Sequence, residues 1–162
     1  MRGDLKIKKK GFTLVELLVT AAILAILAGA ILPMAQVAVK REREIELRRA
    51  LRTIREAIDA YKKLADEKKI EVKEGSDGYP PDLETLVRGV EIKETGEKGR
   101  ERKTVIRFLR KIPLDPMTNS YDWGLLSTRD KPDSDTWGGE NVFDVYTKSP
   151  GRALDGTKYR DW

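Results

Sequence analysis

The chain has no cysteine and no histidine among its 162 residues. Without cysteine it cannot form a disulfide bond in any redox compartment. The absence of histidine removes the most common general base and the most common metal ligand, which excludes Ser-His-Asp and Cys-His catalytic sites and His-ligated metal sites. Carboxylate, lysine or tyrosine chemistry would still be available. The sequence shows no catalytic constellation of these residues, so we expect a protein that is not an enzyme.

The chain also has little net charge once its first residues are set aside. The formal charge is +5 at pH 7, and residues 1–11 alone contribute +4 of it. A nucleic-acid-binding surface would need a basic patch on the body of the protein. The arginines between Arg48 and Arg55 are interspersed with carboxylates, which indicates a solvated helix face with mixed ion pairs and not a stripe that binds DNA or lipid. We therefore predict no nucleic-acid partner.

One long apolar run, residues 12–39, follows the basic N-terminus. Its clearly polar members are Thr13, Glu16, Thr20 and Gln36. As a helix rising about 1.5 Å per residue, the run would extend about 42 Å, enough to cross a hydrocarbon core of about 30 Å. Because basic residues favour the cytoplasmic side, residues 1–11 are predicted to be a cytoplasmic leader and the residues after the run to lie in the periplasm of a bacterium.

A cleaved secretory signal is the alternative interpretation of this run. Ala28-Gly29-Ala30 has the small residues of a signal-peptidase site. The apolar part of such a signal usually spans about 7–15 residues, which is shorter than the run found here. The length therefore favours a helix that is retained in the membrane.

Residues 40–69 are highly charged but keep a helical pattern. Apolar residues recur at alternating spacings of four and three, the period of an amphipathic helix with one buried face. The stripe consists of Leu47, Leu51, Ile54, Ile58, Tyr61 and Ala65, with Ala50, Ala57 and Leu64 beside it. Together with the apolar run, this segment is predicted to form one helix about 80 Å long. Pro33 removes a backbone hydrogen bond within it, so we expect a kink or local melting there.

Residues 70–162 are predicted to form a small periplasmic α+β unit. Glycines and prolines between Gly75 and Pro81 end the long helix, and Asp82 is a candidate N-cap for a short one. The expected elements are a helix at 83–90, an exposed loop at 91–103, a helical turn at 105–111, and strands at 121–127 and 142–147. The predicted fold class is therefore α+β, with a long helix packed on a small antiparallel sheet.

The strongest local signal surrounds the junction between leader and apolar run, Lys8-Lys9-Lys10-Gly11-Phe12-Thr13-Leu14-Val15-Glu16. It combines basic residues, a glycine, a phenylalanine and a carboxylate four positions further along. This segment resembles the cleavage site of type IV pilins and type II secretion pseudopilins. The resemblance implies a pilin-like fold, cleavage between Gly11 and Phe12 by the prepilin peptidase, and N-methylation of the new amino group on Phe12.

Glu16 also stands out on physical grounds. A carboxylate inside an apolar helix is costly and requires a partner. Cleavage after Gly11 would create a cationic amine about one helical turn away. In the resembled family this glutamate contacts the N-terminus of an adjacent subunit, and Pro33 matches a position where helical order is lost in the filament. The alternatives are a Glu16 that reaches water at the interface and a Pro33 that is an incidental kink.

The rest of the chain resembles, more loosely, the major (G-type) pseudopilin of type II secretion. The matching segments, in order, are Tyr79-Pro80, Leu83 to Val87, Pro113 to Pro116, Phe143 to Ser149, and Asp155 to Thr157 before Asp161-Trp162. That family binds calcium in its C-terminal loop, so the resemblance makes Asp155 and Asp161 candidate Ca²⁺ ligands. Residues 91–111 are longer and more basic than the family's usual connection, and the tail lacks the usual paired acidic residues. Asp133, Asp135 and Gly138 have the spacing of an EF-hand loop start, and Asp144 falls at the position of the last ligand. Because Asp144 lies in a predicted strand and no flanking helices are evident, we interpret this match as chance.

These observations predict a structural subunit of a periplasmic pseudopilus. The resemblance implies as partners other copies of the chain, the prepilin peptidase, the secretion platform, minor pseudopilins and the secretin. A type IV pilin for adhesion or motility is the nearest alternative; such pilins often close their C-terminal region with a disulfide, which this chain cannot form. A monomeric, membrane-anchored periplasmic binding module is the third, and it predicts no cleavage at Gly11.

Overall fold

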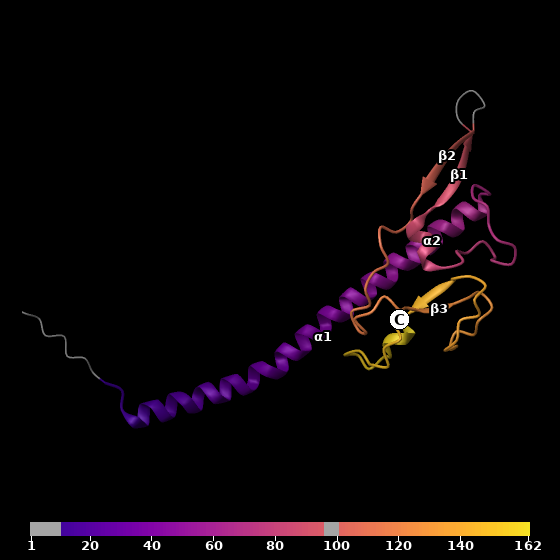
Figure 1. Ribbon diagram of the computed structural model, residues 1–162. Helices are drawn as coiled ribbons and strands as arrows, with labels where there is room; N and C mark the ends of the chain where they lie inside the picture. Colours follow the sequence, from indigo (N-terminus) through magenta and orange to yellow (C-terminus); the bar gives the residue numbers. More distant parts are fainter. Residues whose placement is uncertain (1–10, 96–100) are drawn as a thin grey trace, which may run out of the picture. The chain divides into compact units, whose positions relative to one another are not determined.

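The structure is a computed structural model that describes residues 11–95 and 101–162 (Figure 1). The chain forms two compact units, one ending at Lys40 and the other running from Arg41 to Trp162. One long N-terminal helix and two small antiparallel sheets make up the fold, which confirms the predicted α+β class.

Helix α1, Leu14–Asp66, contains 53 residues and belongs to both units. The backbone stays α-helical through Pro33, so the predicted melting is not seen at this residue, and a kink there stays a prediction. The helix ends three residues before the predicted Lys69. Lys68 adopts a positive φ of 55°, and the Lys68 and Lys69 N–H groups donate to the carbonyls of Ala65 and Leu64. This is a Schellman motif, in which a left-handed residue satisfies the last carbonyls of a helix.

The predicted apolar stripe of α1 forms the centre of the core in the second unit. All six stripe residues are buried, as are Ala50 and Ala57 beside them. Buried side chains from the rest of this unit pack in the same cluster: Leu83, Leu86, Ile92, Leu109, Trp123, Val142, Val145, Ala153 and Tyr159 are among them. Each large apolar side chain removed from water contributes about 1.5–3 kcal/mol, so this stripe holds the unit together.

Helix α2, Leu83–Arg88, confirms the predicted short helix. The Asp82 carboxylate accepts a hydrogen bond from the Thr85 N–H at 2.6 Å, which is the expected N-cap. Gly89 ends the helix with a φ of 85°, and a Cβ atom there would lie 2.4 Å from the Ile106 carbonyl oxygen. Glycine is therefore required where α2 passes into the following strand.

The helical turn predicted at 105–111 is wrong, and so is the loop predicted at 91–103 where the structure describes it; residues 96–100 lie outside the described residues. Strand β1, Val90–Thr95, pairs antiparallel with β2, Glu101–Ile106, with Val90 opposite Ile106. Charged residues hide the strand pattern in the sequence. The apolar residues at the base of this hairpin nevertheless pack on the core, with Ile92 fully enclosed, and this burial decides the conformation.

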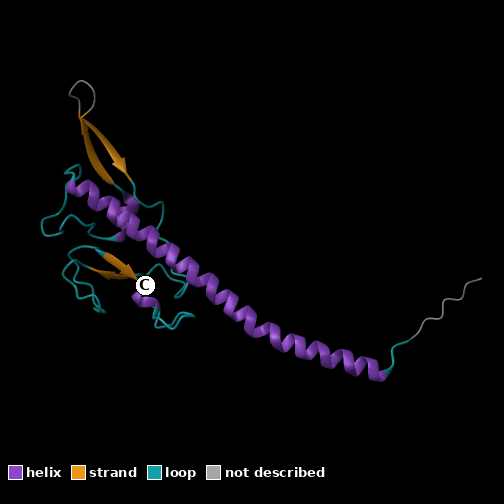
Figure 2. Cartoon of the chain, turned by 180° about the vertical axis from the view of Figure 1, so that it is seen from behind, coloured by secondary structure: helices purple, strands orange, loops and turns teal. Residues whose placement is uncertain are grey.

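The two strands predicted near the end of the chain are confirmed, with shorter bounds. Strand β3, Gly124–Leu126, pairs antiparallel with β4, Asp144–Tyr146. Gly124 lies against the Tyr146 ring, where an added Cβ would come within 2.3 Å of ring atoms. A short 3₁₀ helix, η1, Tyr159–Asp161, follows. In Figure 2 the two hairpins are separate orange ribbons that lie along the C-terminal part of the helix.

Candidate functional site

The predicted cleavage site lies outside the helix. Gly11, Phe12 and Thr13 precede the first residue of α1. The Thr13 carbonyl accepts from the Leu17 N–H at 3.1 Å, and the Thr13 hydroxyl oxygen accepts from the Glu16 N–H at 3.2 Å. Thr13 is therefore the N-cap of α1, and it leaves the peptide bond between Gly11 and Phe12 non-helical.

Sequence reasoning missed the role of Thr13. The signal was present, because Thr13 and Glu16 have the Ser/Thr-x-x-Glu spacing of a capping box. The observed hydrogen bond from the Glu16 N–H is one half of that arrangement. Glu16 thus has a second local role: it lies in the first turn of the helix, where the helix dipole favours a negative charge.

The residues around the cleavage site are accessible. Phe12 is 79% exposed, and a Cβ added at Gly11 would meet no atom within 4 Å. Every side chain of residues 11–39 that the structure describes is exposed. Among the described residues, α1 is the one helix long and apolar enough to cross a membrane. Such a large apolar surface requires a cover of lipid or of other protein chains.

Glu16 has no ion-pair partner in the described part of the chain. It lies one helical turn beyond Phe12, so an amine created at Phe12 would be the nearest new cation along the chain. The side chain of Pro33 lies outside the described part of the structure, and its role in assembly rests on the sequence.

The two predicted calcium ligands lie on one cavity of about 660 Å³ between α1 and the C-terminal residues. Asp155 and Asp161 share this cavity with Arg48, Arg52 and Arg55. Hydrogen bonds from the Thr157 hydroxyl and N–H lower the pKa of the Asp155 carboxyl, and Arg48 adds to this effect at 4.0 Å. Calcium needs six to eight oxygen ligands. No group of three or more candidate ligands gathers in the described chain. Glu56 and Asp59 of α1 also line this cavity, so four carboxylates lie there beside three guanidinium groups. This mixed lining does not form a cluster of calcium ligands, and the calcium site stays a prediction.

The C-terminal loop is instead held by protein contacts. The Glu44 Oε1 atom accepts from the Leu154 N–H and from the Tyr159 hydroxyl, both at 2.9 Å. Burial and this hydrogen bond to Glu44 raise the pKa of Tyr159 to about 12. Further along α1, Arg55 donates to the Asp144 carboxylate at 2.6 Å and to the main-chain oxygen of Trp162 at 2.7 Å.

The EF-hand spacing does not correspond to a metal centre in the described residues. Asp144 pairs with Arg55, and Asp135 pairs with Arg160. In these ion pairs Asp144 of β4 contacts α1, and Asp135 contacts η1. The interpretation of the spacing as chance stays a prediction.

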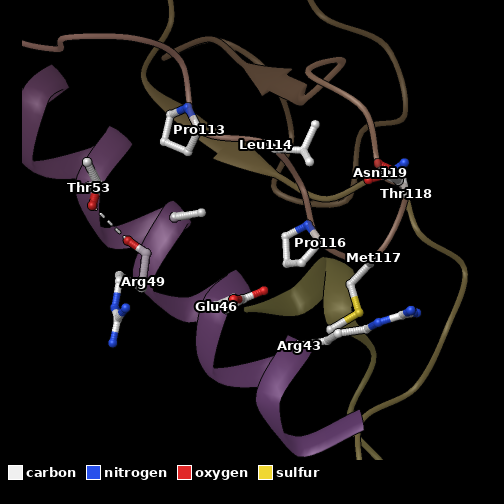
Figure 3. A pocket seen from close by; sticks show the side chains of 11 residues that line it. Arg43, Glu46, Arg49, Thr53, Pro113, Leu114, Pro116, Met117, Thr118 and Asn119 are labelled. Atoms are coloured by element: carbon white, nitrogen blue, oxygen red, sulfur yellow. Dashed lines mark hydrogen bonds between the residues drawn. The ribbon is translucent and has the colours of Figure 1, made fainter. Parts of the chain in front are cut away.

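A larger cavity, about 750 Å³, lies between α1 and the loop that contains residues 113–119 (Figure 3). Arg43, Glu46 and Arg49 come from the helix side, and Figure 3 shows Met117 reaching toward Arg43 while Arg49 points away from the loop. The sequence did not predict this groove. Its lining residues include no nucleophile paired with a base, so it carries no catalytic arrangement.

Comparison with known proteins bears on the N-terminal site. Residues 6–32 match the family described as the prokaryotic N-terminal methylation motif. The match supports a prepilin-type N-terminus like that of type IV pilins, and with it methylation and membrane anchoring. Neither the curated proteins nor the solved structures gave a significant match to the chain.

Proposed function

We propose that this chain is a structural subunit of a type II secretion pseudopilus. It is made as a precursor, cut between Gly11 and Phe12 by the prepilin peptidase, and methylated on the new Phe12 amine. The observation that carries the proposal is the methylation motif at residues 6–32, which covers most of the apolar segment 12–39, whose described side chains are all exposed.

Before assembly the precursor crosses the bacterial inner membrane once, with its leader in the cytoplasm and residues 70–162 in the periplasm. In the filament, the apolar residues 12–39 of many copies pack against one another and replace the lipid. A carboxylate within a membrane helix is costly and requires a partner. Pairing of Glu16 with the Phe12 amine of a neighbouring copy offsets that cost, which makes assembly depend on processing.

The filament's work is mechanical. Each copy added at the membrane lengthens the filament and pushes a folded protein toward the outer-membrane secretin. The secretion platform and minor pseudopilins complete the machine in this proposal. The chain itself has a structural role and performs no catalysis.

A type IV pilin subunit for adhesion or motility is the second candidate, because the methylation motif is equally compatible with it. The lack of cysteine favours the pseudopilus, since no disulfide can close the C-terminal region. Deletion of the gene distinguishes the two. Loss of exported proteins from the medium supports the pseudopilus, whereas loss of surface filaments or of motility with normal export supports the pilin.

The processing step is tested by mass spectrometry of the mature N-terminus. We expect a protein that begins at Phe12 and carries one methyl group on its amine. An intact leader, or an N-terminus near Ala30, overturns the proposal.

Two glycine variants provide the control. A Cβ would meet no atom within 4 Å at Gly11 or at Gly29. Gly11→Val should therefore leave the chain's own fold intact and block cleavage, while Gly29→Ala should be cleaved normally. Equal cleavage of both variants would contradict a peptidase that requires glycine at the cut.

A further inference from the structure

Positive charge is concentrated in the residues that directly follow the apolar run. Residues 40–52 carry six Lys and Arg against three Glu, a net of +3. The described residues after this segment, 53–95 and 101–162, carry 19 Lys and Arg against 21 Asp and Glu, a net of −2. The excess of positive charge therefore adjoins the part of α1 that is long and apolar enough to cross a membrane.

Arg41 and Arg43, here named the collar, lie at the start of this basic segment. Both side chains are exposed, although Arg43 also lines the cavity beside residues 113–119. Neither arginine forms an ion pair within residues 11–95 and 101–162, and neither does Glu42 between them. Glu44, the next carboxylate, is bound to the C-terminal residues. Within the described chain the collar therefore has no counter-ion.

Two other arginines of α1 show what the collar lacks. Arg48 lies 4.0 Å from the Asp155 carboxylate and stacks 3.7 Å from the centre of the Trp162 ring. Arg55 donates to the Asp144 carboxylate at 2.6 Å. These arginines bind the C-terminal residues to the helix, whereas the charges of the collar are available to a partner outside the chain.

The position of the collar matches the depth of lipid headgroups. A bilayer about 40–45 Å thick has a hydrocarbon core of about 30 Å, which leaves about 5–7 Å of headgroups on each side. A helix that rises about 1.5 Å per residue covers this depth in about four residues. Because the apolar run ends at Val39, residues 40–43 are the four that meet the headgroups.

The chemistry of the collar suits a phosphate group. A planar guanidinium presents several N–H donors and binds two phosphate oxygens at once. Positions 41 and 43 are about 200° apart around an ideal helix, so the two side chains can bind different lipids. A headgroup with a net negative charge is attracted more strongly than one whose phosphate is balanced by its own cation.

We propose that Arg41 and Arg43 bind the phosphate groups of anionic phospholipids in the leaflet next to the globular unit. The contact fixes the depth at which α1 leaves the membrane and holds each copy there before assembly. The inference rests on the membrane anchoring in the proposed function and adds a lipid partner to it. A lipid is favoured over the carboxylates of a second copy, because headgroups adjoin residues 40–43 of every inserted chain.

Lipid selectivity of the full-length chain tests this contact. The chain is reconstituted in phosphatidylcholine vesicles at about 0.15 M salt with a trace of spin-labelled phosphatidylglycerol or spin-labelled phosphatidylcholine. The motionally restricted fraction of each label gives the ratio of their association constants. A single Lys or Arg near an anionic surface changes affinity about fivefold. We expect Arg41→Gln combined with Arg43→Gln to lower the ratio by roughly that factor.

The matched control combines Arg49→Gln with Arg52→Gln, the same charge change on the same helix. Both arginines are exposed and without an ion pair in the described part of the chain. Arg49 lies six positions beyond Arg43, about 9 Å along the helix, which exceeds the Debye length of about 8 Å at this salt concentration. The control should keep the parent's selectivity, and every variant keeps the basic leader. An equal loss in both variants, or no loss in the collar variant, overturns the inference.

Two further measurements separate lipid from other anions. Inorganic phosphate in place of chloride, at equal ionic strength, should leave the parent's selectivity unchanged; its loss would instead indicate a site for free phosphate. Filaments of the collar variant are also imaged. If this variant keeps the parent's selectivity but forms no filaments, the collar meets a second copy and the lipid contact is wrong.

A conservative variant and an extraction experiment complete the test. Arg41→Lys combined with Arg43→Lys keeps both charges and should retain the selectivity, and all variants should melt at the parent temperature. Alkaline carbonate distinguishes this inference from the proposed function. If carbonate extracts the parent from membranes, the proposed function fails and the inference fails with it. If the parent stays in the membrane but binds both lipids equally, only the inference is wrong.

Discussion

Glu44 and Tyr159 lie 115 positions apart in the chain and are joined by a hydrogen bond of 2.9 Å. The same Glu44 oxygen accepts the Leu154 N–H. One carboxylate near the start of the globular unit therefore fixes both the turn at residues 153–156 and the short helix η1 against α1. The stability of the C-terminal residues should depend on this single side chain.

Replacement of Glu44 tests that dependence. Glu44→Ala leaves the Tyr159 hydroxyl and the Leu154 N–H without their acceptor, which should lower the free energy of unfolding by about 1–3 kcal/mol. Glu44→Gln is the matched control, because its amide oxygen can still accept a hydrogen bond. Denaturant unfolding of the full-length chain in detergent measures the difference, and equal stability of the Ala variant and the parent would contradict the clamp.

Tyr159 should make the free energy of unfolding fall as the pH rises in the alkaline range. Its pKa is raised from 10.0 to about 12 in the folded chain, so the folded state holds the proton more tightly than the unfolded state. The resulting stabilisation is fully present below pH 10 and is lost as the pH rises from about 10 to 12. Tyr159→Phe has no such proton. The stability difference between parent and variant should therefore shrink over this range in thermal melts, and a difference that does not change with pH would refute the assignment.

Glu16 should matter for assembly and not for folding. Glu16→Gln removes the negative charge but keeps the shape, so we expect processing at Gly11 with loss of filaments by electron microscopy. Thr20→Val is the control. Its hydroxyl bonds locally to the Leu17 carbonyl at 2.9 Å, and its loss should leave assembly intact. Abundant filaments from the Glu16→Gln variant would contradict the proposed role of Glu16 in assembly.

Asp115 is fully buried, and its carboxylate accepts from the Thr147 hydroxyl and from the Met117 N–H. Asp115→Ala leaves both donors unsatisfied in the core and should cost about 3 kcal/mol or more of unfolding free energy. Asp122→Ala is the comparison, since its ion pair with Lys148 is exposed and should contribute less than about 1 kcal/mol. Similar losses from the two variants would show that burial of Asp115 is not decisive.

Calcium should not stabilise the isolated chain, because Arg48, Arg52 and Arg55 occupy the same cavity as Asp155 and Asp161. We expect the melting temperature to be the same in excess Ca²⁺ and in chelator. A rise with Ca²⁺ that Asp155→Asn abolishes would instead establish the calcium site implied by the pseudopilin resemblance.

The sequence predicted those helices, caps and strands whose residues show a regular local pattern. The apolar stripe from Leu47 to Ala65, the N-cap at Asp82 and the strand around Val145 were all identified in advance, because helical and strand periodicity are properties of neighbouring residues. The charged hairpin β1–β2 was not, since burial of Ile92 against residues distant in the chain outweighs its composition.

The sequence by itself determined the membrane helix, the amphipathic stripe and the motif around Gly11, Phe12 and Glu16. Each of these depends on the order and spacing of residues within one continuous segment. Tertiary structure decided which charges meet. Asp144 lies beside Arg55 from 89 positions away, and Glu44 reaches Tyr159 from 115. Such pairings depend on how distant segments pack, and no spacing along the chain encodes them.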